Sequence, residues 1–440
     1  MAQASIAMAT PEPKSVAANA EAEANDAAEA RRKAAAASSL CVANGIFMTA
    51  TMMLLPARAP MVLKIMKGDA SATARTLGLM SSCGAALELF LNPVFGRLSD
   101  KYGRKPFLLL APAVRAFLHA LAAALPNSLP MQFVDRIIGA AMVFTFQAPI
   151  NAALTDLFSG QQLAISMSRN QTFFGLGCAI GPFIGARLGG AKAFATSSAV
   201  FVLSMLWLVL KFPETLTDEG RKEFDLAACS PVRFVKLFYG KTMSALAATI
   251  ALQSFGDYPN LYDFNFLYLK TVFGWGQAEV GSFATVVGVT QIIGGEAMGN
   301  VIKVAGQKSA ALVSNLAYIL SLGLLGTSRS IEQLAASVFA MTFGHLRATP
   351  VSAYLQKHGQ AARMGRAEIV SAQMNLTALI KVVAPMLYGN VFSWATSDGR
   401  KMPGLPYALI CALTLVSQLV FWSVDPDAEP KTVPSGRSSA

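Results

Sequence analysis

The chain has 440 residues, of which 54% are hydrophobic and only 14% are charged. Soluble domains carry about 25% charged residues, so this composition excludes an ordinary soluble enzyme as the first interpretation. The net charge of +11 does not indicate nucleic-acid binding, because the basic residues are scattered through short segments between apolar runs and form no recognition motif. We therefore expect a protein embedded in the lipid bilayer, without a nucleic-acid partner.

Residues 1–38 are rich in alanine and polar residues, with acidic side chains placed before a basic triplet at 31–33. A secretory signal peptide would place its basic residues first and an apolar core after them. We expect instead a polar cytoplasmic tail here, and a second one at 425–440.

Twelve apolar runs follow, each near the roughly 20 residues that a bilayer-spanning helix needs. The expected spans lie near 40–56, 75–96, 106–125, 130–155, 168–190, 195–212, 243–269, 278–302, 309–327, 331–355, 367–394 and 404–424. The polar linker 213–242 divides them into 39–212 and 243–424. This pattern predicts an all-α membrane protein with twelve transmembrane helices in two six-helix bundles.

The distribution of Lys and Arg predicts the orientation of the chain. Most of the 36 basic residues fall in segments on the side of the N-terminus, if every span crosses the membrane. Because basic loops stay in the cytoplasm, both termini are expected to be cytoplasmic. The first outer loop opposes this rule, since it carries Arg58, Lys64, Lys67 and Arg75.

A faint internal repeat links the two halves. An offset of 203 residues carries Gly96, Gly103 and Lys105 onto Gly299, Gly306 and Lys308, and it carries Pro182 onto Pro385. An unchanging offset at separated landmarks is typical of duplicated halves. The repeat is imperfect, because Asp100 corresponds to Lys303.

The most distinctive segment is GRLSDKYGRK, between the second and third spans. Gly96 and Gly103 permit close backbone approach and tight turning, while Asp100 can pair with Arg104 or with a neighbouring helix end. Together with Lys105, this cluster can latch the two bundles on one face and release them when they rock. The alternative is a loop that only sets the topology.

This segment resembles the signature loop of the major facilitator superfamily. Three further segments agree with that family in order and spacing. In DRIIGAAM of the fourth span, Arg136 and Gly139 resemble the family's arginine motif. The segment GLGCAIGPFIGARLGG at 175–190 resembles the glycine-proline motif of antiporters, and PETL at 213–216 resembles the tetrapeptide after the sixth span. Within the superfamily, the chain is similar to the tetracycline-efflux-like and hippocampus-abundant-transcript-like branch. The segments FLYLKTVFGW and APMLYGNVF also resemble sequences of that branch.

The resemblance implies a rocker-switch carrier with a central cavity lined by the first, fourth, seventh and tenth spans. The signature loop would act as the gate, and Arg136 would be the coupling arginine. In the fifth span, Gly181, Pro182 and Gly185 would allow close packing and bending.

Two features depart from the tetracycline-efflux pattern, which carries acidic residues in the first and third spans. Residues 40–56 contain no acid, and the third span has Arg115 and His119 instead. These departures argue against tetracycline transport and against its proton-coupling scheme.

Ionisable side chains inside the spans are costly, so they usually face a cavity or a partner. Arg115 and Lys381 lie near the middle of their spans. Less central are Glu88, Asp257, Asp263, Glu296 and Arg347. We interpret these residues as substrate ligands or proton carriers, or alternatively as ion pairs that only fix helix packing. The cations hint at an anionic substrate, which the nearby aspartates oppose.

The seventh span interrupts its apolar run at FGDYPN. Because proline removes a backbone donor, and unwound backbone at this depth is tolerated where it lines a cavity, we interpret this stretch as substrate-contacting or gating. The candidate cavity residues are Gln253, Asp257, Tyr258, Asn260 and Tyr262, and Asp257 is also a candidate coupling residue. The alternative is a loop at the outer end of the span.

The tenth span has a similar break at GHLRATP, where His345 and Arg347 are candidate cavity residues. Histidine titrates near neutral pH, so His345 or His119 could couple to protons, or either could be a packing residue. In the fourth span, Gln147 and Asn151 lie four apart on one face. They are candidate substrate ligands, or else they bind neighbouring helices.

The sequence therefore predicts a secondary transporter, not an enzyme, that moves a small organic solute by alternating access. The fifth-span motif favours proton-coupled antiport or efflux. The alternatives are a facilitative or symport carrier for sugars or organic anions, and a non-transporting receptor or assembly factor on the same scaffold. The sequence shows neither metal-ligand cysteine spacing nor a GxxxxGK[ST] loop, so we expect no metal and no cofactor. We expect a monomer in the plasma membrane or an organelle membrane, with protons as the coupling ion.

Overall fold

The structure describes residues 13–216, 221, 223–224, 230–345, 347–397 and 399–426. Within these ranges, the side chains left undescribed are those of 13–24, 26, 160–161, 164, 233, 258–260, 262, 295–300 and 366–367.

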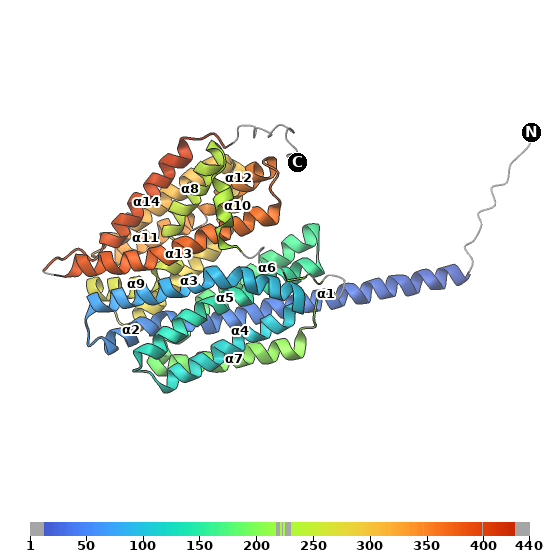
Figure 1. Cartoon of the computed structure of the whole chain (residues 1–440), viewed down its shortest axis with the longest axis horizontal. Coiled ribbons are helices and arrows are strands. Elements are labelled where there is room, and N and C mark those ends of the chain that lie inside the picture. The colour runs from blue at the N-terminus through green and yellow to red at the C-terminus, as the bar shows by residue number, and fades with distance from the viewer. Residues whose placement is uncertain are drawn as a thin grey trace, which may run out of the picture.

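In this computed structural model, the helices form two bundles, which lie one above the other in Figure 1. The first bundle contains α1 (Pro13–Met53), α2 (Leu55–Ile65), α3 (Ala70–Tyr102), α4 (Arg104–Ala124), α5 (Leu129–Leu157), α6 (Gly160–Leu188) and α7 (Gly190–Lys211). The second contains α8 (Lys241–Phe255), α9 (Tyr258–Phe273), α10 (Gln277–Gly326), α11 (Ile331–Gly344), α12 (Ala348–Ala361), α13 (Arg366–Thr396) and α14 (Leu405–Trp422). A short 3-10 helix of the linker, η3 (Pro231–Phe238), packs on α13 and α8.

These helices give twelve membrane spans. By length and composition alone, eight stretches of the described chain can cross a bilayer: Ala27–Ile65, Ala70–Tyr102, Arg104–Ala124, Leu129–Leu157, Gly190–Lys211, Val301–Gly326, Glu368–Thr396 and Leu405–Trp422. The other four spans are α6, the first half of α10, and the two broken helix pairs α8–α9 and α11–α12. The predicted all-α fold with two six-helix bundles is confirmed.

The first span is longer than predicted at both ends. α1 runs without interruption from Pro13, so the described part of the predicted tail is helical (Figure 1). Beyond a short break at Leu54 the chain continues as α2, because Pro56 lies in the first turn of that helix, where proline needs no backbone donor. Arg58 therefore belongs to a spanning helix. Its assignment to the first outer loop was wrong, and one conflict with the predicted orientation disappears.

The seventh and tenth spans are broken, as their sequences predict, but more narrowly. In the seventh span only Gly256 and Asp257 separate α8 from α9, and the proline at 259 lies in the first turn of α9. In the tenth span, α11 ends at Gly344 and α12 starts at Ala348. The prolines begin the second helix of each pair instead of unwinding it.

The 203-residue repeat is visible in the backbone. The break at Leu54 in the first span corresponds to the break at Asp257 in the seventh. Gly103 and Gly306, at equivalent turns, both have positive φ, 105° and 79°. Side chains disfavour this backbone region, so glycine is required at both turns.

The apolar cores show where the bundles meet. One cluster joins both bundles, with Val62 and Leu77 packed in the same group as Leu267 and Phe392. Three other clusters each belong to one bundle: the first bundle has one around Phe47 and one around Phe194, and the second has one around residues 246–250. We call the end of the molecule from which α1 projects the tail face, and the opposite end the far face. The bundles converge at the far face and diverge toward the tail face (Figure 1).

Two glycine contacts close the far face, and they are related by the repeat. Gly78 of α3 packs on the backbone of Pro385 in α13, where a Cβ would lie 2.6 Å from the carbonyl oxygen. Gly281 of α10 packs on Pro182 of α6, where a Cβ would lie 2.9 Å from the carbonyl oxygen. Each pair obeys the offset of 203, so one backbone packing arrangement is used twice.

Candidate functional site

A cavity of about 370 Å³ lies between the bundles. Its apolar wall includes Met48, Met52, Val143 and Phe174 of the first bundle. Its charged wall contains six side chains, four basic and two acidic: Arg58, Arg115, Arg136, Lys381, Glu88 and Asp263. This volume is within the range of small-molecule sites, about 300–1,000 Å³.

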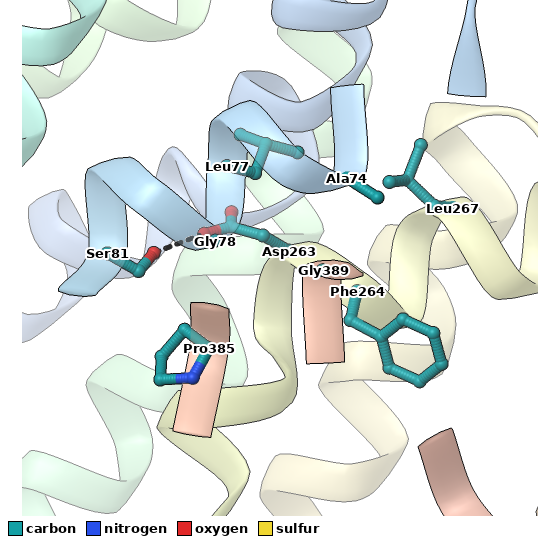
Figure 2. Close-up of a pocket in the computed structure, with 9 residues that line it drawn as sticks. All are labelled: Ala74, Leu77, Gly78, Ser81, Asp263, Phe264, Leu267, Pro385 and Gly389. Carbon is teal, nitrogen blue, oxygen red and sulfur yellow. Dashed lines mark hydrogen bonds between the residues drawn. The ribbon is translucent and has the colours of Figure 1, made fainter. Parts of the chain in front are cut away.

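Arg136 and Asp263 form an ion pair between the bundles. Nη2 of Arg136, on α5, lies 2.9 Å from a carboxylate oxygen of Asp263, on α9. The Ser81 hydroxyl donates to the same carboxylate at 3.1 Å and accepts from Arg136 at 2.9 Å. Figure 2 shows Ser81 and Asp263 facing each other beside Gly78, Pro385 and Gly389. The pair therefore lies beside the glycine contact that closes the far face.

A second ion pair crosses the same interface. Nζ of Lys381, on α13, lies 3.4 Å from Oε1 of Glu88, on α3. Both side chains line the cavity and keep part of their surface exposed, 32% and 16%. The predicted cavity residue Lys381 is thus placed at the cavity, with a carboxylate partner.

Arg58 and Asp135 form a third ion pair, fully inside the first bundle. Their closest atoms are 2.5 Å apart, and the two side chains are 5% and 0% exposed. His119 lies beside them, with Nε2 3.3 Å from Asp135 and Nδ1 2.9 Å from the Ser197 hydroxyl. His119 is fully buried and does not line the cavity, so its position fits the packing interpretation.

Arg115 is the one basic residue of the cavity wall that has no carboxylate within 4 Å among the described residues. Its side chain is 4% exposed, and Nε is buried without a hydrogen-bond acceptor. The guanidinium lies over the ring of Phe201, 5.2 Å from the centroid. Gly139 of the predicted arginine motif leaves the space that one end of this guanidinium occupies.

The broken seventh span holds a separate charged pair. Asp257 lies 3.1 Å from Nη2 of Arg347, which also donates to the Gln253 carbonyl at 2.6 Å. Tyr318 donates to the Gly256 carbonyl and lies under the Arg347 guanidinium, 3.8 Å from its ring centroid. These bonds satisfy the backbone freed by the break. The structure thus pairs Asp257 with Arg347 and places the other candidate coupling residue, Arg136, elsewhere.

Four further predicted cavity residues are not among the described residues of this cavity wall: Gln147, Asn151, Gln253 and His345. Gln147 donates to Asn44 at 2.7 Å, and Asn151 is exposed. His345 lies 3.3 Å from the Thr290 hydroxyl. The side chains of Tyr258, Asn260, Tyr262 and Glu296 lie outside the described part of the chain.

The signature loop is bonded within the first bundle. Arg104 lies 2.5 Å from Asp100 and 3.1 Å from Asp156, and Lys105 donates to the Phe212 carbonyl at 2.6 Å. Gly96 is open, with no atom within 4 Å of the position a Cβ would take. The loop thus joins α3, α4, α5 and the end of α7.

Glu214 of the PETL segment holds the start of α4. It accepts from the backbone N–H groups of Arg104 and Lys105, both at 2.9 Å. Burial would raise the pKa of Glu214, but bonds from the N–H groups of Leu216, Arg104, Lys105 and Thr215 outweigh it and hold this pKa below its usual value. The carboxylate therefore caps the helix and fixes the turn at Gly103.

In the fifth span, the predicted packing residues contact the first span. A Cβ at Gly181 would lie 2.6 Å from the Cβ of Met52, and one at Gly185 would overlap the Met53 carbonyl oxygen. Pro182 lies one step around the helix and contacts Gly281 of the other bundle. This stretch therefore packs α6 on α1 and on α10 together.

The sequence did not single out Arg58 or Asp135 as site residues, and it did not assign Glu88 or Asp263 to the cavity. Glu88 and Asp263 were recognised as intramembrane charges, and that signal could have placed them in the cavity. Arg58 was missed because the first span was assumed to end at Pro56. Asp135 was missed because attention went to Arg136, the next residue, which matches the arginine motif.

Two six-helix bundles around a charged cavity define a membrane carrier. The sequence profile of the Major Facilitator Superfamily matches residues 40–266, about half of the chain, and the protein belongs to that superfamily. It is therefore a secondary transporter and a multi-pass integral membrane protein, not an enzyme.

The relatives confirm the predicted branch. The chain is 24% identical over 350 residues to the class H tetracycline resistance protein of Pasteurella multocida, covering 77% of this chain and 85% of the relative. It is 22% identical over 370 residues to human hippocampus abundant transcript-like protein 1, covering 78% and 72%.

Solved structures show the same fold. The human organic anion transporter MFSD10 (TETRAN) matches with a TM-score of 0.65 and 18% identity, over 88% of this chain and 99% of that one. The nucleoside transporter NupG matches with a TM-score of 0.69 and 12% identity, over 88% of this chain and 98% of that one.

Proposed function

We propose that the protein is a proton-coupled antiporter that exports a small organic solute, and that the Arg136–Asp263 pair couples the proton to the movement of the bundles. This pair is the observation that carries the proposal, because it joins the bundles, lines the cavity and borders the closed far face.

An antiporter must prevent its empty form from switching between the two sides. With Asp263 ionised, its pairs with Arg136 and Ser81 hold the far face closed. A proton on Asp263 removes one charge of the pair and weakens the contact. A solute bound in the cavity lies beside Arg136 and Asp263, which both line it, and weakens the same contact. Either ligand releases the far face, whereas the empty carrier stays closed.

The gate and the orientation complete the proposal. The signature loop, with Asp100, Arg104 and Lys105, is proposed to latch on the second bundle when the tail face closes, since its described partners now belong to the first bundle. We also propose that the tail face is cytoplasmic. This face carries the basic triplet at 31–33 and the signature loop, and Arg58 no longer counts against the orientation.

Proton–anion symport is a second candidate, and one observation favours it. The cavity wall carries four basic and two acidic side chains, so protonation of Asp263 would free Arg136 to bind an anion that moves together with the proton. The direction of proton movement relative to solute movement separates the two candidates. Opposite directions support antiport, and equal directions support symport.

Two pairs of spin labels test the coupling without a known substrate. On the far face, labels at Lys64→Cys and Lys401→Cys, both exposed, report the distance between the bundles. On the tail face, labels at Lys101→Cys and Lys357→Cys do the same. The native cysteines are replaced first. We expect acidification to lengthen the far-face distance and shorten the tail-face distance.

Asp263→Asn should imitate the protonated state, so its far-face distance is long at every pH. Glu29→Gln is the matched control, because that exposed carboxylate lies on α1 away from the cavity wall and pairs with Lys33 among the described residues. Distances that ignore pH would refute the proton link. Distances that never change, with pH or with solutes, would support the non-transporting alternative.

A further inference from the structure

We infer that the cavity binds an organic monoanion, with its carboxylate paired to Arg115 and its apolar body against the first bundle. This inference rests on the proposed transport function and names the class of solute that the carrier moves. It depends on the charge balance of the cavity, on the position of Arg115 and on the apolar wall.

One basic side chain of the cavity wall has no carboxylate partner among the described residues. Three of the four basic residues on the wall have a carboxylate partner: Arg58 has Asp135, Arg136 has Asp263, and Lys381 has Glu88. Arg115 has none within 4 Å among the described residues, and Asp135 is already bonded to Arg58. The side chains of the cavity wall, with their described carboxylate partners, therefore carry one uncompensated positive charge.

The position of Arg115 suits a ligand better than a structural role. The side chain is buried, with 4% of its surface exposed, yet Nε has no acceptor. An unpaired charge at mid-membrane depth is costly, and such residues face a partner or a pathway. Phe201 and Gly139 fix the guanidinium without neutralising it. Its unused donors form the planar fork that binds a carboxylate with two parallel hydrogen bonds.

The wall around Arg115 defines the rest of the solute. Met48, Met52, Val143 and Phe174 form an apolar surface on the side of α1, α5 and α6. Methionine and aromatic side chains adapt to flat apolar ligands. A solute with one carboxylate and an aromatic or aliphatic body satisfies both surfaces, whereas a dianion would exceed the single free charge.

The test compares 1-naphthoate with the neutral 1-naphthamide, by titration against the purified full chain in detergent. We expect wild type to bind the naphthoate about 10- to 100-fold more tightly, the range for one charge-assisted bidentate contact. Arg115→Gln should remove this preference, and Arg115→Lys should keep part of it. Arg187→Gln, at an exposed arginine stacked on Phe183, should leave it unchanged.

Folding of the variant is checked by its melting temperature without ligand. Because Arg115 is unpaired, Arg115→Gln should melt at the wild-type temperature or above it. Equal binding of naphthoate and naphthamide to wild type would overturn the inference, and so would a preference that survives in Arg115→Gln.

The outcomes also separate this inference from the proposed function. If naphthoate binds through Arg115 while the spin-label distances ignore pH, the proton coupling fails and the substrate class stands. If the distances respond to pH while naphthoate has no advantage, the substrate class fails and the proton coupling stands.

Discussion

The two interfaces between the bundles, α3–α13 and α6–α10, share a backbone arrangement but differ in chemistry. Gly78 and Gly281 play equivalent roles, each packed on a proline of the opposite bundle. The positions of Glu88 and Lys381, however, correspond through the repeat to Gln291 and Cys178, which also line the cavity. Close packing is thus kept on both sides, whereas at these four compared positions charge lies on the α3–α13 side only. Of these two interfaces, α3–α13 is therefore the one that holds an ion pair at the compared positions.

The largest expected effect breaks the shared packing. Gly78→Val and Gly281→Val should each keep the far face from closing, because a Cβ at either position meets backbone or side-chain atoms of the other bundle. Overpacking of this kind costs about 1–3 kcal/mol, enough to shift a two-state equilibrium about 5- to 150-fold. The far-face spin-label distance measures the shift. An effect at only one of the two glycines would contradict the equivalence.

An effect of similar size, on stability rather than on closure of the far face, is expected at the turns of the repeat. Gly103→Ala and Gly306→Ala should each lower stability by about 1–3 kcal/mol, because both glycines have positive φ. The loss should be greater at Gly103, where a Cβ would lie 2.5 Å from a Glu214 oxygen, than at Gly306, where nothing lies within 4 Å. Thermal unfolding in detergent ranks the two. A greater loss of stability at Gly306 than at Gly103 would show that the Glu214 side chain moves aside at little cost.

The charge pair should have a modest effect that is confined to one interface. Glu88→Gln or Lys381→Met should each cost about 1 kcal/mol, since both side chains are partly exposed and the pair is partly screened. Gln291→Ala and Cys178→Ala, at the equivalent positions, should change stability by less than about 0.5 kcal/mol. A double-mutant cycle measures the coupling. Zero coupling between Glu88 and Lys381 would remove the distinction between the interfaces.

The smallest effect concerns Glu214, for which the described second half shows no such carboxylate cap at Gly306. Its pKa is lower in the folded protein than the usual 4.5, so its contribution is present above pH 4.5 and is lost as the pH falls through the folded pKa. Glu214→Gln should therefore be less stable than wild type at pH 7, with a free energy of unfolding lower by under about 1 kcal/mol. At pH 3 the difference should shrink. A difference that persists there would assign it to the shape of the side chain rather than to its charge.

Much of the fold could be predicted because its signals are local. The lengths of the apolar runs predicted the membrane spans, and the polar interruption at Gly256 and Asp257 predicted the break in the seventh span. The constant offset between Gly103 and Gly306 indicated the repeat, which the two positive φ angles confirm. The error at Arg58 has a local cause as well, because Pro56 can either end one helix or begin the next.

The candidate site could be predicted only in part. Arg115 and Lys381 were placed in the cavity because a central charge must face one, whereas Gln147 and His345 bond to neighbouring helices instead. Helical spacing tells which residues share a face. It does not tell whether that face meets another helix or the cavity.

The sequence alone determined the class of protein, the two halves and the set of intramembrane charges. The tertiary structure decided which charges are partners. Arg136 meets Asp263 across 127 residues, Lys381 meets Glu88 across 293, and Arg115 meets no carboxylate in the described chain. The reason is physical. Hydropathy acts residue by residue along the chain, but the free energy of a buried charge depends on what the packed helices bring within a few ångströms of it.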